Sequence, residues 1–191
     1  MGLDLGVAPP AHDPGGARLL KLPKGTIADA VFAGPNQEYR VMLSRVWDQT
    51  NRTRLLAAMM NPSTAGHEWD DPTVAKIGRL ARRLGYGGLL VGNACAYRAT
   101  DKMRLLEVDD PVGPENHEWL RFMARRADLI LIGHGILPKG LQHHARKMCD
   151  VLAQSGKPLH VLRLSKDGTP AHPLYLPDAL DPVVWERSIG Q

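Results

Sequence analysis

Asn61 and His172 each stand directly before a proline, at a point where an apolar segment has ended. Asn61 follows the apolar run 55–60, and His172 follows the run 159–164 after a short turn. Proline fixes its own φ angle and biases the preceding residue toward an extended backbone, which restricts the direction of both polar side chains. An amide can position a water molecule, and an imidazole can donate a hydrogen bond or transfer a proton. We therefore expect both residues to be aimed rigidly at one place.

The segments that must position these residues alternate between short apolar stretches and amphipathic helices. The apolar stretches are 54–60, 89–92, 129–132 and 159–164, and the predicted helices cover 71 or 73 to 84, 114–126 and 141–154. This alternation is typical of a parallel sheet with helices on both faces. We predict an α/β fold with three α/β/α layers around a central, mainly parallel four-stranded sheet.

The beginning of the chain has a different character. Residues 1–16 are rich in Gly, Pro and Ala, and we expect a flexible N-terminal arm over residues 1–25. Two β-like stretches between residues 26 and 47 flank a Gly-Pro-Asn sequence, which predicts an N-terminal β-hairpin. Residues 26–191 then form a single domain.

Four polar residues end the predicted parallel strands or follow them closely: Asn61, Asn93, His134 and His172. Ligands of such sheets bind beyond the C-terminal strand ends, so we expect these four residues to converge at one edge. Asn93 could read the edge of a nucleobase through its amide donor and acceptor. Each residue also has a structural alternative, because asparagine often caps a strand end and a lone histidine is more often structural.

Further candidates lie near this predicted edge. Ser63 and Thr64 could bind an anion in the turn after Asn61, or could cap the local backbone. The loop after Asn93 carries Arg98, Lys102 and Arg104, which could contact phosphates, and the nearest aromatic residues for base stacking are Trp69 and Tyr97. Asp70 and Asp71 precede a proline and a predicted helix, so we expect them to cap that helix.

The 191-residue chain has a formal net charge of +4 and a pI of about 9.2. This charge favours an anionic partner, nucleic acid first, although many enzymes of small metabolites are also basic. The two cysteines form no Cys-x-x-Cys pair, and His143, His144 and Cys149 lack a zinc spacing. We expect neither a metal nor an organic cofactor. A reduced, cytoplasmic setting without membrane contact is also expected, since no apolar run reaches membrane-spanning length.

Several short motifs resemble those of the uracil-DNA glycosylase superfamily. Residues 60–63 (Met-Asn-Pro-Ser) are similar to its first motif, and residues 93–100 resemble the strand end that carries a base-reading asparagine. Residues 172–176 (His-Pro-Leu-Tyr-Leu) look like its C-terminal His-Pro motif. A wider set of motifs is also similar to a bacterial and phage family of unassigned function: Asn-Pro-Ser-Thr-Ala (61–65), Asp-Asp-Pro-Thr (70–73), residues 93–100, Asp-Pro-x-Gly-x-Glu-Asn (110–116) and residues 172–176. The resemblance spans residues 55–177.

The resemblance implies a role for each matching position. Asn61 would orient the attacking water, Asn93 would read a flipped base, and His172 would donate to a pyrimidine carbonyl as negative charge develops. Ser63, Trp69 and Tyr97 would contribute to the base pocket, and Thr64, Tyr175 and Leu176 would join the DNA contacts. No acidic residue stands in the water-activating position of the first motif.

The expected function is therefore hydrolysis of the N-glycosidic bond of a deaminated, damaged or modified base of the uracil type in DNA, by a nucleoid-associated monomer. Two alternatives stay open. One is an enzyme that acts on free or phage-modified nucleotides. The other is a module that binds a nucleobase or DNA without chemistry.

Overall fold

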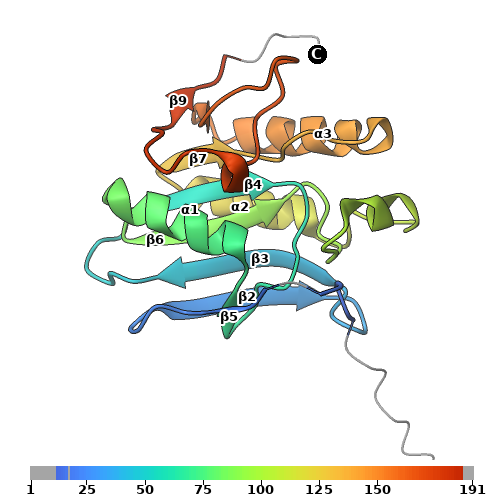
Figure 1. Cartoon of the computed structure of the whole chain (residues 1–191), viewed down its shortest axis with the longest axis horizontal. Helices are drawn as coiled ribbons and strands as arrows, with labels where there is room; N and C mark the ends of the chain where they lie inside the picture. Colours follow the sequence, from blue (N-terminus) through green and yellow to red (C-terminus); the bar gives the residue numbers. More distant parts are fainter. Residues whose placement is uncertain (1–11, 17, 187–191) are drawn as a thin grey trace, which may run out of the picture.

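The computed structural model describes residues 12–16 and 18–186 of the chain. Its centre is a seven-stranded sheet with the order β2-β3-β6-β4-β7-β8-β9 (Figure 1). The strands are β2 (Ile27–Ala33), β3 (Tyr39–Val46), β4 (Arg54–Met59), β6 (Gly88–Asn93), β7 (Leu129–Ile132), β8 (Leu159–Val161) and β9 (Val183–Val184). Strands β6, β4, β7 and β8 run parallel, and the other three join antiparallel. The expected α/β class with a mostly parallel centre is confirmed.

The sheet is wider than the four strands that we predicted. β3 pairs with β2 on one side and with β6 on the other, so the segment before residue 47 extends the central sheet. At the opposite edge β9 pairs with β8. Pairing between β3 and β6 joins residues far apart in the chain, for example Leu43 and Val91, and no local pattern in the sequence marks it.

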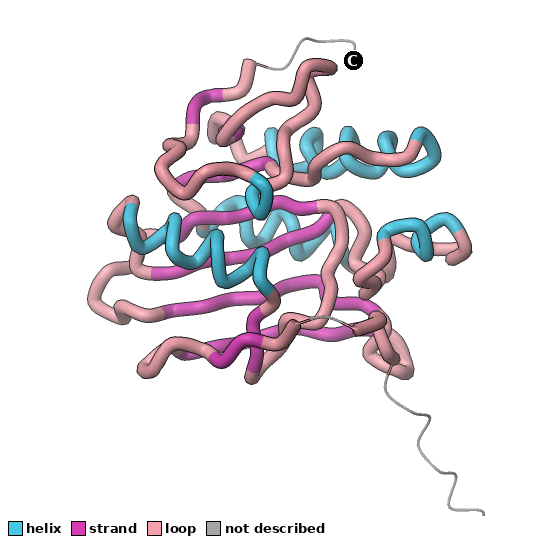
Figure 2. The backbone as a smooth tube through the Cα atoms, viewed as in Figure 1, coloured by secondary structure: helices cyan, strands magenta, loops and turns pink. Residues whose placement is uncertain are grey.

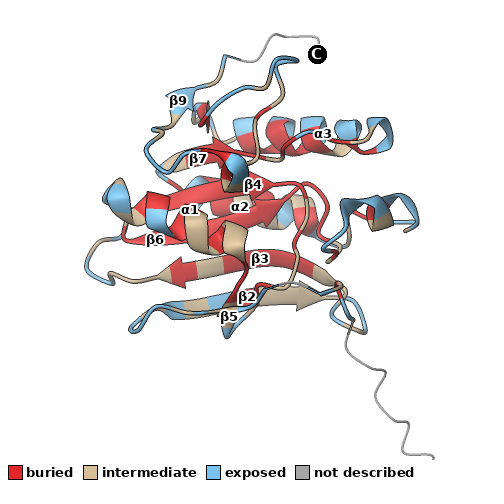
Figure 3. Ribbon diagram, in the orientation of Figure 1, coloured by how far each residue is buried: buried red, intermediate tan, exposed pale blue. Residues whose placement is uncertain are grey.

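Helices cover both faces of the sheet. Helix α1 (Pro72–Arg83) lies on one face, and α2 (Asn116–Arg126) and α3 (Gln142–Ala153) lie on the other (Figures 1 and 2). Successive side chains of a strand point to opposite faces. Accordingly, Leu55 and Ala57 of β4 pack with α1, whereas Leu56 and Ala58 pack with α2 and α3. Figure 3 shows the central strands as the most buried part of the molecule.

Helix α1 matters for the site because it begins at the sheet edge. Asp71 is its N-cap, and Pro72 occupies its first turn, where a missing N–H costs no helical hydrogen bond. The helix ends in a Schellman motif, since Tyr86 N donates to Ala81 O and Gly85 N donates to Arg82 O. Gly85 has a φ of 82°, a left-handed conformation that glycine adopts without strain.

The remaining elements are short. They are β1 (Leu20–Lys21), β5 (Trp69–Asp70) and the 3₁₀ turns η1 (Lys102–Leu106), η2 (Lys139–Leu141) and η3 (Pro173–Tyr175). β1 pairs with β5, so this part of the predicted arm is held against the domain; residues 1–11 and 17 lie outside the described residues. Within the described ranges, no helix is long and apolar enough to cross a membrane.

Candidate functional site

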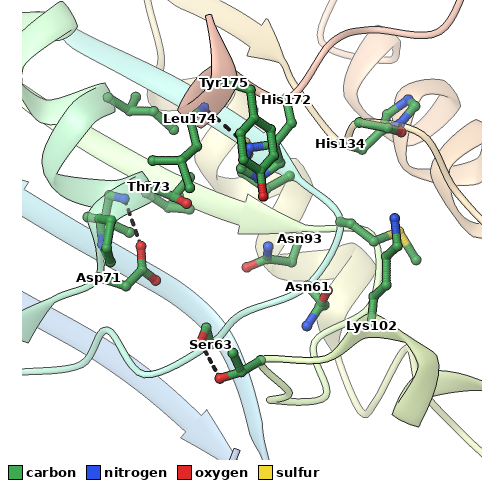
Figure 4. Close-up of a pocket in the computed structure, with 18 of the residues that line it drawn as sticks. Asn61, Ser63, Asp71, Thr73, Asn93, Lys102, His134, His172, Leu174 and Tyr175 are labelled. Carbon is green, nitrogen blue, oxygen red and sulfur yellow. Dashed lines mark hydrogen bonds between the residues drawn. The ribbon is translucent and has the colours of Figure 1, made fainter. Parts of the chain in front are cut away.

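A cavity of about 770 Å³ opens at the C-terminal ends of the parallel strands (Figure 4). Asn93 ends β6, Asn61 follows β4, and His134 lies just beyond β7. The first turn of α1, the start of η1 and the segment around η3 complete its walls. This is the sheet edge at which ligands bind in α/β folds, so the cavity is the candidate functional site.

The cavity brings together most of the residues that we predicted for the site. All four predicted edge residues line it: Asn61, Asn93, His134 and His172. Ser63, Lys102, Tyr175 and Leu176 line it as well. Leu176 is only 5% exposed and packs with the core, whereas Tyr175 is 81% exposed. Leu176 is thus a wall residue, and Tyr175 is the one whose ring can contact a ligand from outside.

Three other predicted residues, Thr64, Trp69 and Tyr97, do not line the cavity. Trp69 belongs to β5, where it pairs with Lys21 of β1. The Tyr97 ring packs edge-on against Tyr39, with the ring centres 5.7 Å apart. The Thr64 hydroxyl is buried and has no hydrogen-bond partner among the described residues. The two aromatic residues are therefore not placed to stack on a ligand in the cavity, and Thr64 is not placed to contact one there.

The two arginines predicted to contact phosphates, Arg98 and Arg104, also lie away from the cavity. Arg98 Nη1 donates to Gln37 O at 2.9 Å, and its guanidinium lies 5.0 Å from the centre of the Phe32 ring. Arg104 Nη1 donates to Asp13 O at 3.2 Å. The charged side chains that do line the cavity include three exposed cations, Arg18, Lys102 and Arg163.

Asn61 has one free polar atom. Its Nδ2 donates to Pro62 O at 3.1 Å and to Ala99 O at 2.6 Å, which uses both amide hydrogens. No described residue donates to its Oδ1. The side chain is therefore fixed in orientation, with a carbonyl oxygen left to accept a hydrogen bond from water or from a ligand.

The hydrogen bonds of His172 determine its tautomer. Its Nδ1 accepts from Leu174 N at 3.3 Å, and a backbone N–H can only donate. Burial lowers the pKa of His172, an effect that Asp71 partly opposes. The ring is therefore neutral at pH 7 and carries its proton on Nε2. In this state His172 is a hydrogen-bond donor toward the cavity.

His134 has the opposite tautomer. Its Nδ1 lies 2.9 Å from Gly135 O, and a carbonyl can only accept, so Nδ1 carries the proton. Burial lowers the pKa of His134, although the bond to Gly135 opposes the shift. Its Nε2 is thus a bare acceptor. The cavity wall contains one neutral imidazole that donates and one that accepts.

Asp71 has a second role besides the helix cap that we predicted. Its Oδ1 accepts from Val74 N at 2.9 Å, which confirms the cap. The second carboxylate oxygen has no hydrogen-bond partner among the described residues, and the residue lines the cavity. Asp70, for which we also predicted a cap, instead forms an ion pair with Arg45 at 2.9 Å. The sequence could not separate the two because both acids precede the same helix.

Arg40 of β3 also lines the cavity, and sequence reasoning missed it. It is 2% exposed, and its Nη2 donates to Asn93 Oδ1 at 3.2 Å. Burial lowers its pKa to about 10, with Asp71 opposing the shift, so the guanidinium is charged at neutral pH. The one available signal was a charged residue directly before the apolar run 41–43 of the strand.

The chain belongs to the family described as "Protein of unknown function (DUF1643)", whose match covers residues 40–174. That range begins at Arg40 and ends in η3, and it contains most residues of the cavity wall. No curated protein and no solved structure matched the chain. Within the described part of the chain, no group of three or more His, Cys, Asp or Glu residues could hold a metal ion.

Proposed function

We propose that this protein is an N-glycosyl hydrolase that releases a nucleobase from its sugar. One observation carries the proposal: a neutral imidazole with Nε2–H and a carboxylate with a free oxygen, His172 and Asp71, line the same cavity. Hydrolysis of this bond develops negative charge on the leaving base and positive charge on the sugar. A fixed donor and a fixed carboxylate are the groups that stabilise these two charges.

On the base side, the carbon–nitrogen bond breaks and its electron pair moves into the base. His172 Nε2–H donates to a base oxygen or nitrogen that gains negative charge. A neutral imidazole suits this role because its fixed N–H dipole points at the position where negative charge develops. Asn93, whose amide oxygen accepts a hydrogen bond from Arg40, positions the base by contacting a part of the base that His172 does not contact.

On the sugar side, a water molecule adds its hydroxyl group to the anomeric carbon. The free oxygen of Asp71 stabilises the sugar cation and accepts the water proton, which finally reaches the released base. Asn61 Oδ1, on the other side of the cavity, is left to accept a hydrogen bond from a hydroxyl group of the ligand. Figure 4 shows Asp71 and Asn61 on different sides of the cavity, with Asn93 between them.

The resemblance to the uracil-DNA glycosylase superfamily supports this proposal. Its three motifs, residues 60–63, 93–100 and 172–176, all contribute residues to the cavity wall. Asp71 lies outside the first motif and supplies the carboxylate that this motif lacks. For the same reason, we propose that the fold is of the glycosylase type.

We propose a base in DNA as the substrate, and a free nucleotide as the second candidate. The exposed cations Arg18, Lys102 and Arg163 around the cavity suit a phosphate in either ligand. The intramolecular bonds of Arg98 and Arg104 favour the smaller ligand, because they remove two expected contacts to a DNA backbone. Salt separates the two, since DNA binding weakens steeply as salt rises.

The test is base release from labelled single- and double-stranded oligonucleotides that carry uracil, hypoxanthine, xanthine, 5-hydroxymethyluracil or a thymine mismatch, with the matching free nucleotides in parallel. Asp71→Asn keeps an N-capping oxygen but removes the charge, and His172→Asn keeps an acceptor for Leu174 N but removes Nε2–H. His143→Asn, an exposed change outside the cavity, is the matched control.

Base release that both cavity variants lose by about 100-fold or more, and the control retains, is the expected result. Absence of release from every substrate by folded protein would refute the hydrolase. Tight, salt-sensitive oligonucleotide binding without release would instead identify a binding module.

A further inference from the structure

The buried Arg40 has no close ion-pair partner among the described residues, although Asp71 acts on it from a greater distance. Its Nη1 donates to Ala65 O at 2.8 Å and its Nη2 donates to Asn93 Oδ1, but its Nε has no hydrogen-bond partner among the described residues. No described carboxylate lies within 4.0 Å of it. A buried charge without an ion pair is costly, so an electron-rich ligand in the adjacent cavity would offset part of that cost, although the Nε atom itself is inaccessible.

Arg40 also determines which atom of Asn93 is available to a ligand. A guanidinium can only donate, so the amide oxygen of Asn93 must face Arg40. No described residue accepts a hydrogen bond from Asn93 Nδ2, and this residue lines the cavity. Asn93 therefore offers the cavity a donor, with a second donor group, the guanidinium, beside it.

Two neighbouring donors match only some nucleobase edges. Uracil and thymine place a donor, N3–H, between two carbonyl oxygens, so a base whose oxygen accepts from Asn93 Nδ2 would bring N3–H against the guanidinium, which has no acceptor. The O6 and N7 atoms of a 6-oxopurine are both acceptors; arginine donors recognise this pair in DNA, and asparagine donates to the N7 acceptor of adenine. The N3 and O2 atoms of cytosine form a similar pair of acceptors.

We infer that the cavity selects a base whose recognised edge presents two adjacent hydrogen-bond acceptors, as in a 6-oxopurine or cytosine, over a uracil-type base. The inference rests on the proposed function for the ligand class, a nucleobase, and changes the uracil-type specificity that the resemblance implies. Asn93 and Arg40 act together as the specificity-determining pair.

Equilibrium binding of small base analogues to the full chain tests the inference without any turnover. The probes are 9-methylhypoxanthine, its 7-deaza analogue, 1-methylcytosine and 1-methyluracil, in which a methyl group replaces the sugar and fixes the tautomer. We expect at least one of the two acceptor-pair bases to bind about 10-fold or more tightly than 1-methyluracil. Two well-matched hydrogen bonds to one base edge are worth about 1–3 kcal/mol of discrimination. If the purine is the ligand, the 7-deaza analogue, which lacks the N7 acceptor, loses this advantage.

Arg40→Met provides the second arm, because it removes the cation and frees the Asn93 amide to rotate. We expect the preference over 1-methyluracil to fall to within about threefold. Binding of 1-methyluracil as tightly as both acceptor-pair bases, or no binding of any probe, would overturn the inference, and this comparison in the wild-type protein stands even if the variant fails to fold.

Base release from oligonucleotides separates the inference from the proposed function. Selective analogue binding without release of any base would refute the hydrolase and keep the specificity. Release that favours uracil over hypoxanthine and cytosine would keep the hydrolase and refute the specificity.

Discussion

Two arginines of the same strand, Arg40 and Arg45, have the same exposure of 2% but opposite surroundings. Arg45 pairs with Asp70 at 2.9 Å, and each of its nitrogens donates a hydrogen bond within the protein. Arg40 has two such bonds, an unpartnered Nε and no carboxylate partner among the described residues. The difference shows that burial of a charge does not by itself indicate function. A buried charge that has no described carboxylate within 4.0 Å and that lines a cavity, as Arg40 does, is the better candidate for binding a ligand.

The largest expected effect is the loss of folding stability on substitution of Arg45. Arg45→Met leaves the Asp70 carboxylate buried without a partner and should lower the free energy of unfolding by about 3–5 kcal/mol. Arg40→Met removes a charge that no described carboxylate contacts directly and should cost less than about 2 kcal/mol, mainly for two unmet acceptors. Urea unfolding of both variants measures the difference, and equal losses would contradict the distinction between the two arginines.

The next effect is on activity at the cavity side. Asp71→Asn and His172→Asn should each lower the rate of base release by about 100- to 1000-fold. Their stability should change by less than about 1 kcal/mol, because each retains an acceptor for the backbone N–H that it caps. Rates under single-turnover conditions, compared with urea midpoints, check both statements. A rate loss that only follows a loss of folded protein would show a structural role.

A smaller effect concerns pH, and it also belongs to the cavity side. Burial lowers the pKa of His134 and His172, so the folded state binds fewer protons than the unfolded state near pH 6. Their contribution to stability is therefore complete above about pH 6.5 and is lost as the pH falls toward the folded pKa values, by at most about 1.4 kcal/mol per pH unit for each residue.

Stability measured between pH 5 and 8 tests this slope. The pKa values of His117 and His144, outside the cavity, are lowered by burial as well, so the double variant His134→Asn/His172→Asn should remove only part of the slope. An unchanged slope would show that the two cavity histidines are not held neutral.

The smallest effects separate the arginines outside the cavity from Lys102, which lines the cavity although its Nζ also donates to Ile136 O at 2.7 Å. Arg98→Lys and Arg104→Ala should leave oligonucleotide or nucleotide affinity within about twofold, because their guanidiniums bond to backbone carbonyls away from the cavity. Lys102→Ala should weaken binding and reduce the salt dependence by about one charge. Affinities at two or more salt concentrations check this. A larger loss of affinity in the Arg98 variant than in the Lys102 variant would show that Arg98 contacts phosphate, as the sequence alone predicted.

Much of the fold could be predicted because its signals are local. β7 has the bounds that were predicted, and α1 differs by a residue at its C-terminal end, since periodicity, the Asp-Pro start and the glycine stop all agree there. The pairing of β3 with β6 could not be predicted, because the partners are distant in the chain. β8 was predicted to run to residue 164 but ends at Val161, and residue 164 forms an isolated bridge in the following turn.

The candidate site divides in the same way. Asn61, Asn93 and His172 could be placed because strand ends meet at one edge of a parallel sheet. Arg98 and Arg104 could not, since long side chains in a loop can turn toward either a ligand or the protein's own carbonyls. Arg40 enters the cavity from an antiparallel strand, a position that the rule for parallel strand ends does not cover.

Single-turnover base release by the wild-type protein and His172→Asn, across the oligonucleotide panel, tests the central claim most directly. The account predicts release of at least one base by the wild type and a loss of about 100-fold or more in the variant, with the fold intact. Release that is equally fast in both proteins, or no release by folded wild-type protein from any substrate, would contradict it.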